Sequence, residues 1–150
     1  MILDRYLGQT IAIYTGIVFL VLLALFSFTM FVTELGDVGK GDYSLLLAAQ
    51  FVLLSLPRLS YQLFPAIALL GTIIGLGVLA NSSELLVLRV SGVSIFRIIG
   101  AVMKTGLILM VLALILGEFV APITERLALN LRNAAFSEQA ALMTRQGYWV

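Results

Sequence analysis

The sequence predicts an all-α membrane protein with three transmembrane helices, and three observations support that class. The chain is 61% hydrophobic and only 11% charged, whereas ordinary soluble domains are about 25% charged. Its mean hydropathy is +1.11. Long segments without any charge recur along it, and a spanning helix needs about 20 apolar residues. A soluble domain of this length would need a charged surface, which this sequence lacks.

The composition also excludes several kinds of site. The chain has no Cys and no His, which removes disulfides and thiolate ligands and the commonest general base and metal ligand. Gly39-Lys40 lacks the spacing and the hydroxyl of a phosphate-binding loop. The net charge of +1 gives no basis for nucleic-acid binding. We therefore expect no catalytic residue, no metal, no bound cofactor and no nucleic-acid partner.

The first predicted transmembrane helix covers about residues 6–33, which hold 28 positions without a charge. This run is too long for a cleavable signal peptide, whose apolar region is usually about 7–15 residues. Residues 34–42 are a predicted loop, because three glycines and four charges fall within nine positions.

The second predicted helix covers about residues 44–82, and Pro57 and Pro65 are expected to kink or break it. A re-entrant element over residues 43–58 is an alternative. Gly71 and Gly75 form a GxxxG pair, and small residues let helix backbones approach closely in lipid. We expect this pair to pack against the first or the third helix.

A short polar-tipped segment at residues 80–92 separates the second and third spans, with a predicted helix at about 82–91. Asn81 and Glu84 have the spacing of a capping box, and Gly92 can adopt a left-handed C-terminal cap. At about 1.5 Å per residue this helix is too short to cross a membrane. The residues leave two interpretations open: it lies on lipid headgroups, or it docks in a groove of another protein.

The third predicted span covers about residues 98–120, with Lys104 and Glu118 near ends from which charged groups can reach the interface. A proton-carrying role for Glu118 is the alternative. Residues 123–141 predict an amphipathic helix leaving the membrane, and residues 144–150 predict a strand. Because a lone strand is unstable, we expect a second, β-rich domain to begin within residues 122–150 and to be cut short there. Residues 1–121 are then the membrane domain.

The basic residues are a weak guide to orientation. When only the N-terminus and the short loops are counted, four Lys or Arg residues lie on the side of the N-terminus and two on the other side, which favours a cytoplasmic N-terminus. Including Arg126 and Arg132 makes the two counts equal.

Six segments form a recognisable series: LDRYLGQT at 3–10, Leu56-Pro57-Arg58, FPAIALLGTIIGLGVLANSSELLVLRVSG at 64–92, VMKT at 102–105, GEFVAP at 117–122 and QGYW at 146–149. In this order and spacing they resemble the N-terminal part of the LptF/LptG family, the permease subunits of the lipopolysaccharide export ABC transporter. The resemblance covers the chain from end to end.

The resemblance implies a full subunit with six transmembrane helices, split three and three by a periplasmic β-jellyroll domain. This chain would hold the first three helices and the start of the jellyroll. It would be a non-catalytic subunit of the bacterial inner membrane with a cytoplasmic N-terminus. The implied partners are an LptF-type permease, an LptB-type ATPase dimer and an LptC-type single-helix protein, besides lipopolysaccharide and membrane lipids. ATP and Mg would be bound by the ATPase.

The resemblance also makes the short segment a cytoplasmic coupling helix that sits in a groove of the ATPase. The residues expected to couple are Glu84, Leu85, Leu88, Arg89, Ser91 and Gly92.

Lipopolysaccharide combines acyl chains with phosphates, so the resemblance implies contacts of both kinds. Phe26 and Met30 would meet acyl chains, or would simply face membrane lipid. Lys40 and Arg132 would meet phosphates, with a solvated surface charge as the alternative for Arg132. Some relatives have Lys near positions 30, 36 and 37, and this chain departs from them there.

The function that the resemblance implies is extraction of lipopolysaccharide from the inner membrane, powered by ATP hydrolysis in another chain. A force-transmitting scaffold subunit of an ABC-type complex is the alternative, since its 80–92 segment would look the same. A channel or secondary transporter would bury ionisable groups mid-helix, and none of the three predicted spans has a charge at its centre.

Overall fold

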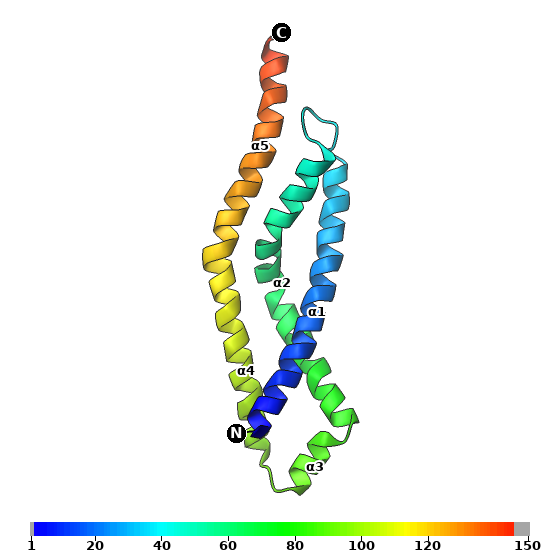
Figure 1. The fold of residues 1–150 in the computed structure, drawn as a ribbon, viewed down its shortest axis with the longest axis vertical. Coiled ribbons are helices and arrows are strands. Elements are labelled where there is room, and N and C mark those ends of the chain that lie inside the picture. The colour runs from blue at the N-terminus through cyan, green and yellow to red at the C-terminus, as the bar shows by residue number, and fades with distance from the viewer. Residues whose placement is uncertain (1, 146–150) are drawn as a thin grey trace. The chain divides into compact units, whose positions relative to one another are not determined.

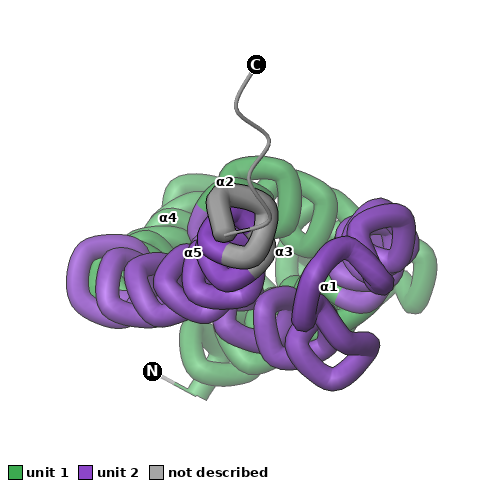
Figure 2. Tube along the Cα trace, turned by 90° about the horizontal axis from the view of Figure 1, so that it is seen from above, with its two compact units in different colours: residues 1–23, 62–115 green, residues 24–61, 116–150 purple. Residues whose placement is uncertain are grey.

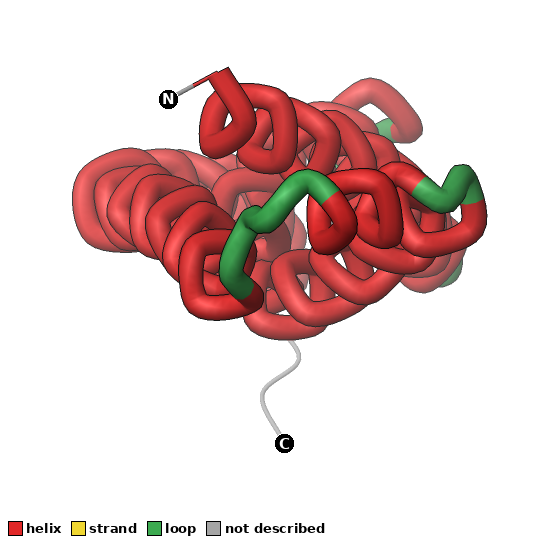
Figure 3. The backbone as a smooth tube through the Cα atoms, turned by 90° about the horizontal axis from the view of Figure 1, so that it is seen from below, coloured by secondary structure: helices red, strands yellow, loops and turns green. Residues whose placement is uncertain are grey.

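The computed structural model describes residues 2–145, and all of them are helix or loop (Figures 1 and 3). The long helices are α1 (Ile2–Leu35), α2 (Leu45–Asn81), α4 (Ile95–Ile115) and α5 (Ala121–Arg145), and the short helix is α3 (Glu84–Val90). Three helical segments are long and apolar enough to cross a membrane: Ile2–Leu35, Leu45–Asn81 and Ile95–Glu138. Over residues 2–145 the protein is therefore all-α, as predicted.

The outward faces of these helices are apolar. Leu20, Leu69, Met103 and Phe119 are each more than 60% exposed, on three different helical segments. Soluble monomers rarely expose large contiguous apolar patches, whereas lipid tails cover such side chains at no cost. The exposed apolar surface supports a multi-pass membrane protein.

The chain divides into two compact units (Figure 2). Unit 1 combines Met1–Leu23 with Gln62–Ile115, and unit 2 combines Ala24–Tyr61 with Leu116–Val150. Each has its own core. Leu7, Leu79 and Ala101 form the core of unit 1, and Tyr43, Ala48 and Ala135 form that of unit 2.

In unit 1, the two glycines of the GxxxG pair face α1. A Cβ atom on Gly71 would lie 2.5 Å from the Cα atom of Thr15, and one on Gly75 would lie 3.2 Å from that of Ile11. At Gly71 the backbones approach more closely than a larger residue allows, and at Gly75 a Cβ atom would be tightly packed. Small residues pack helices closely in lipid in this way.

α2 continues through Pro57 and Pro65 as one α-helix of 37 residues. Proline removes a backbone donor, but neighbouring groups in a membrane protein compensate for such losses. The helix leaves no break for the re-entrant element that the sequence allowed.

A π-helical turn, Leu116–Val120, joins α4 to α5. In a regular α-helix the ring of Pro122 would clash with the carbonyl group four residues earlier, that of Glu118, which lies inside this turn. The wider turn accommodates the proline. Gly117 also belongs to it, and a Cβ atom there would overlap the ring of Tyr61. The helix therefore widens locally before Pro122 and continues as α5 to Arg145.

The strand predicted at residues 144–150 falls mostly outside the described residues. Thr144 and Arg145 end α5, and residues 146–150 lie beyond the described range. The β-jellyroll domain therefore stays a prediction.

Candidate functional site

The start of α3 differs from its predicted capping. Asn81 is the last residue of α2, and Ser83 precedes α3 in the left-handed conformation, with φ 59 and ψ 9, without a side-chain capping hydrogen bond. A capping residue normally has an extended backbone, which directs its side chain to the first amides of the helix. The predicted capping box is therefore wrong, because Ser83 is used to turn the chain sharply from α2 into α3.

The end of α3 has the predicted left-handed glycine. Gly92 has φ 86, its amide donates to the Arg89 carbonyl at 3.1 Å, and the Val93 amide donates to the Leu88 carbonyl at 3.1 Å. This pair of bonds is a Schellman motif, which satisfies carbonyl groups that a helix end leaves unpaired. The prediction for Gly92 is confirmed.

One side of α3 is anchored within unit 1. Leu85 and Leu88 are half-buried and pack against the cluster of Leu7, Leu79 and Ala101. At the first residue of α3, the carboxylate of Glu84 accepts a hydrogen bond from the Tyr6 hydroxyl of α1 at 2.7 Å. The short helix is therefore held by apolar packing and by one charge-assisted hydrogen bond.

The other side of α3 is open and apolar. Its outer face consists of Leu86, Val87 and Val90, which are 62%, 61% and 81% exposed. Residues four apart lie on one side of a helix. Phe96, just beyond at the start of α4, is 85% exposed. Glu84, Leu85 and Leu88, which were predicted to contact a partner, make contacts inside unit 1 and are still partly exposed. Their contact with a partner stays a prediction.

Arg89 and Ser91, two further residues predicted to couple, lie at the end of α3. Arg89 is in its last turn. The Ser91 hydroxyl donates to the Val87 carbonyl at 2.8 Å, so it belongs to the helix end. A cavity of about 250 Å³ opens beside the Tyr6–Glu84 hydrogen bond, lined also by Ser82, Val87 and Leu88. It is large enough to receive a side chain from a partner.

A second constellation, the ion cluster, lies in unit 2 and joins α5 to the loop between α1 and α2. It consists of Glu34, Asp37, Tyr43 and Arg132. The Arg132 guanidinium pairs with Asp37 at 3.0 Å and with Glu34 at 3.5 Å. The Tyr43 hydroxyl donates to Glu34 at 2.7 Å. Glu34 is only 5% exposed, so its charge requires these partners.

The charge of Arg132 is therefore occupied by carboxylates. Its guanidinium also lies 5.3 Å from the ring centre of Phe51 and 5.8 Å from that of Phe136, which adds cation–π attraction. A phosphate group would have to compete with Glu34 and Asp37 for it.

The other predicted lipopolysaccharide residues also lie in unit 2. Lys40 pairs with Asp37 at 2.6 Å. Phe26 is exposed and Met30 is half-buried, both on α1.

Two groups of the loop have shifted pKa values. The ammonium group of Lys40 and the guanidinium of Arg132 hold the pKa of Asp37 below its ordinary value. Burial, reinforced by the carboxylate of Glu34, raises the pKa of Tyr43. Both shifts favour the protonation states that the ion cluster requires at neutral pH.

Sequence reasoning missed Tyr6, Glu34 and Tyr43 as functional partners. Tyr6 and Tyr43 flank apolar runs, where aromatic residues usually mark the interface, and Glu34 reads as an ordinary loop charge. Their partners lie far away in the chain: Tyr6 and Glu84 are 78 positions apart, and Asp37 and Arg132 are 95 apart. No local pattern reports such contacts.

Comparison with known proteins places the chain among membrane permeases. The family model described as lipopolysaccharide export system permease LptF/LptG matches residues 5–150. The lipopolysaccharide export system permease protein LptG of Escherichia coli K12 is 40% identical over 148 residues, 99% of this chain and 41% of that protein. LptG of Haemophilus influenzae Rd is 40% identical over 147 residues, 98% of this chain and 41% of that protein. The chain thus spans about two fifths of the length of these relatives.

Proposed function

The chain belongs to the lipopolysaccharide export system permease LptF/LptG family, and from this membership we propose that it is part of a subunit that moves lipopolysaccharide out of the inner membrane. Its N-terminus is cytoplasmic, and ATP and Mg are bound by a separate ATPase. The subunit works with an LptF-type permease, an LptB-type ATPase dimer and an LptC-type single-helix protein. The family match over residues 5–150 and the three membrane-compatible helical segments support this assignment.

The observation that carries the coupling step is the two-sided character of α3. Its inner side is tied to α1 through Tyr6 and to the core of unit 1 through Leu85 and Leu88. Its outer face of Leu86, Val87 and Val90 is open. A helix transmits movement only if it is held on both sides, and we assign the outer face to the ATPase groove. In this proposal Glu84 and Leu88 fix α3 to unit 1, and they do not form the docking surface.

We assign the substrate contacts to unit 2. Phe26 and Met30 of α1 would contact acyl chains, and Lys40 and Arg132 would contact phosphates. Because both cations are already paired with Asp37 or Glu34, phosphate binding would proceed by exchange of a carboxylate for a phosphate. The gain from such an exchange is smaller than that from pairing a free cation, which suits a substrate that must be released.

Co-purification of the full-length subunit with its ATPase tests the coupling step. We expect Leu86→Asp to weaken the association about tenfold or more, because a charge in the centre of an apolar contact must be desolvated. The matched control is Leu46→Asp, at a position 68% exposed in unit 2, compared with 62% for Leu86. The control should retain the ATPase.

Lipopolysaccharide release from proteoliposomes, measured on the same preparations, tests the transport step. Leu86→Asp should reduce ATP-dependent release in proportion to the ATPase lost. If Leu86→Asp and Leu46→Asp retain equal ATPase and release lipopolysaccharide at the wild-type rate, α3 lies on the membrane interface and does not couple. If the ATPase binds normally but no lipopolysaccharide is released by the wild type, the subunit is a force-transmitting scaffold.

A further inference from the structure

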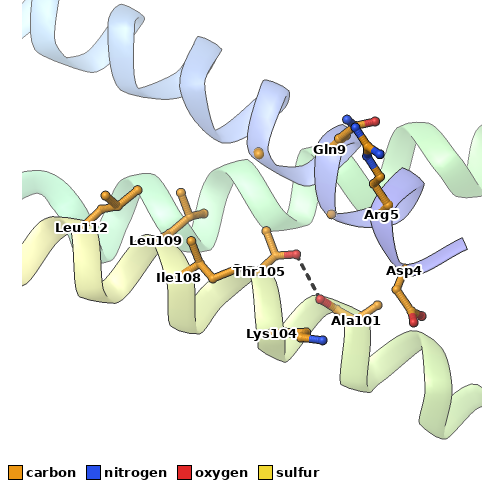
Figure 4. A pocket seen from close by; sticks show the side chains of 11 residues that line it. Asp4, Arg5, Gln9, Ala101, Lys104, Thr105, Ile108, Leu109 and Leu112 are labelled. Atoms are coloured by element: carbon orange, nitrogen blue, oxygen red, sulfur yellow. Dashed lines mark hydrogen bonds between the residues drawn. The ribbon is translucent and has the colours of Figure 1, made fainter. Parts of the chain in front are cut away.

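A groove of about 510 Å³ lies between the beginning of α1 and residues 101–112 of α4, within unit 1 (Figure 4). Its volume is in the range of small-molecule sites. The two helices come close at Gly8, where a Cβ atom would lie 2.8 Å from the Thr105 hydroxyl. That hydroxyl already donates to the Ala101 carbonyl at 3.0 Å, so Thr105 has no proton left to donate to a ligand.

The lining of the groove changes character along its length. Arg5 of α1 and Lys104 of α4 lie at one end, and Ala12, Ile108, Leu109 and Leu112 line the remainder. Figure 4 shows Ile108, Leu109 and Leu112 in a row along α4, with Lys104 before them on α4 and with Arg5 on the facing helix α1, where its side chain points away from Lys104. From Lys104 to Leu112 the helix rises about 12 Å. The groove is thus charged at its mouth and apolar along its wall.

The charge at the mouth is positive and is not compensated. Arg5 and Lys104 form no ion pair with another residue of the described range 2–145. Asp4, the acidic residue at the mouth, lies 3.8 Å from Arg97 of α4. Three cations and one carboxylate leave a local charge of +2.

We propose that this groove binds one anionic glycerophospholipid of the surrounding membrane. Its phosphate lies between Arg5 and Lys104, and one acyl chain follows Ile108, Leu109 and Leu112. Basic pockets between transmembrane helices are suited to anionic headgroups. The lining shares no residue with the proposed substrate contacts, since Phe26, Met30, Lys40 and Arg132 all belong to unit 2.

Two other occupants fit the lining less well. A soluble phosphate would satisfy the cations but would leave the row of Ile108, Leu109 and Leu112 uncovered. A further transmembrane helix of the subunit would cover that row but would need an acidic side chain of its own beside Arg5 and Lys104, because burying two unpaired cations is costly in a membrane. A molecule that is anionic at one end and apolar along its length matches both features.

Native mass spectrometry of the full-length subunit in its complex, titrated with phosphatidylglycerol or phosphatidylcholine, tests the proposal. We expect the wild type to retain one phosphatidylglycerol more tightly than phosphatidylcholine. Arg5→Gln and Lys104→Gln should each raise the Kd for phosphatidylglycerol about fivefold. Ala12→Phe should weaken both lipids by filling the apolar wall. Arg126→Gln, which removes an exposed cation outside the groove, is the matched control and should leave the Kd unchanged.

Three results would overturn the proposal. The first is equal retention of the two lipids by the wild type, which would remove the argument from charge. The second is an unchanged Kd in all three groove variants. The third is displacement of phosphatidylglycerol by an equimolar amount of purified lipopolysaccharide, which would assign the groove to the substrate. Lys104 is solvent-exposed and has no ion-pair partner among residues 2–145. We therefore expect Lys104→Gln to leave the fold intact, so that a change in its Kd reports on lipid binding.

Discussion

At Gly71, α2 approaches α1 closely within unit 1. A Cβ atom there would meet both the Cα atom and the hydroxyl of Thr15 at 2.5 Å. Because the nearest atom is backbone, no side-chain rotation relieves the overlap, and the helices would have to separate. Gly77, on the same helix, has nothing within 4 Å of the equivalent position, so the two glycines differ only in their packing.

We predict that Gly71→Ala lowers the free energy of unfolding by about 1–3 kcal/mol, the usual cost of overpacking. Gly77→Ala is the matched control and should be neutral or stabilising by up to about 1 kcal/mol, since alanine favours helix more than glycine does. Thermal unfolding in detergent measures both. Equal midpoints for the two variants would mean that the close approach at Gly71 is not what holds the helices together.

At the scale of elements, the loop at residues 36–44 is held to α5 by charge. Arg132 bridges Asp37 and Glu34, and Tyr43 stacks on Phe136 with ring centres 5.4 Å apart. Lys40 adds a second cation beside Asp37. These contacts stabilise the ionised carboxylate of Asp37 in the folded state, which is why its pKa is lowered.

A lowered folded-state pKa makes the contribution of Asp37 depend on pH. The stabilisation is fully present above the ordinary value of 3.8 and is lost as the pH falls through the lowered pKa, because the unfolded chain binds the proton more readily. We predict that Asp37→Asn lowers the unfolding temperature at pH 7 and that the difference from wild type disappears well below 3.8. A difference that persists unchanged in acid would show that Asp37 acts through packing instead.

At the scale of the whole molecule, the membrane-compatible helical segments determine on which side of the membrane each loop lies. If α1 and α2 each cross the membrane once, the loop at residues 36–44 and the segment that follows α3 lie on opposite sides. Basic residues lie beside the segment that follows α3, and they favour a cytoplasmic location for that segment. The chain has no cysteine of its own, so single cysteines can report each side.

We predict that Asp42→Cys reacts with a membrane-impermeant maleimide in intact spheroplasts and that Ser94→Cys reacts only after lysis. Both positions are exposed, and the full-length subunit would be used with any other cysteine replaced. Labelling of both positions from outside would mean that α2 does not cross the membrane. The reversed pattern would place the N-terminus outside the cytoplasm.

The number and class of the helices follow from the sequence alone. Whether a segment crosses a membrane depends on the free energy of transferring its own residues into lipid, which composition and length report directly. The left-handed conformation of Gly92 is equally local, because it depends on the absence of a side chain. Features that depend on the residues of one segment were therefore predictable, whereas the start of α3 was not, because the capping box predicted at Asn81 and Glu84 did not form.

The tertiary structure decided which side chains face inward and which charges meet. Leu85 and Leu88 pack against Leu7, Leu79 and Ala101, whereas Leu86 and Val90 are exposed. Arg132 finds Asp37 across 95 positions of sequence. Such choices depend on the free energy of contacts between distant segments, and packing and ion pairing act only after the fold has brought those segments together. Composition made this chain a membrane protein, and the packing of its helices determined which of its residues are open to partners.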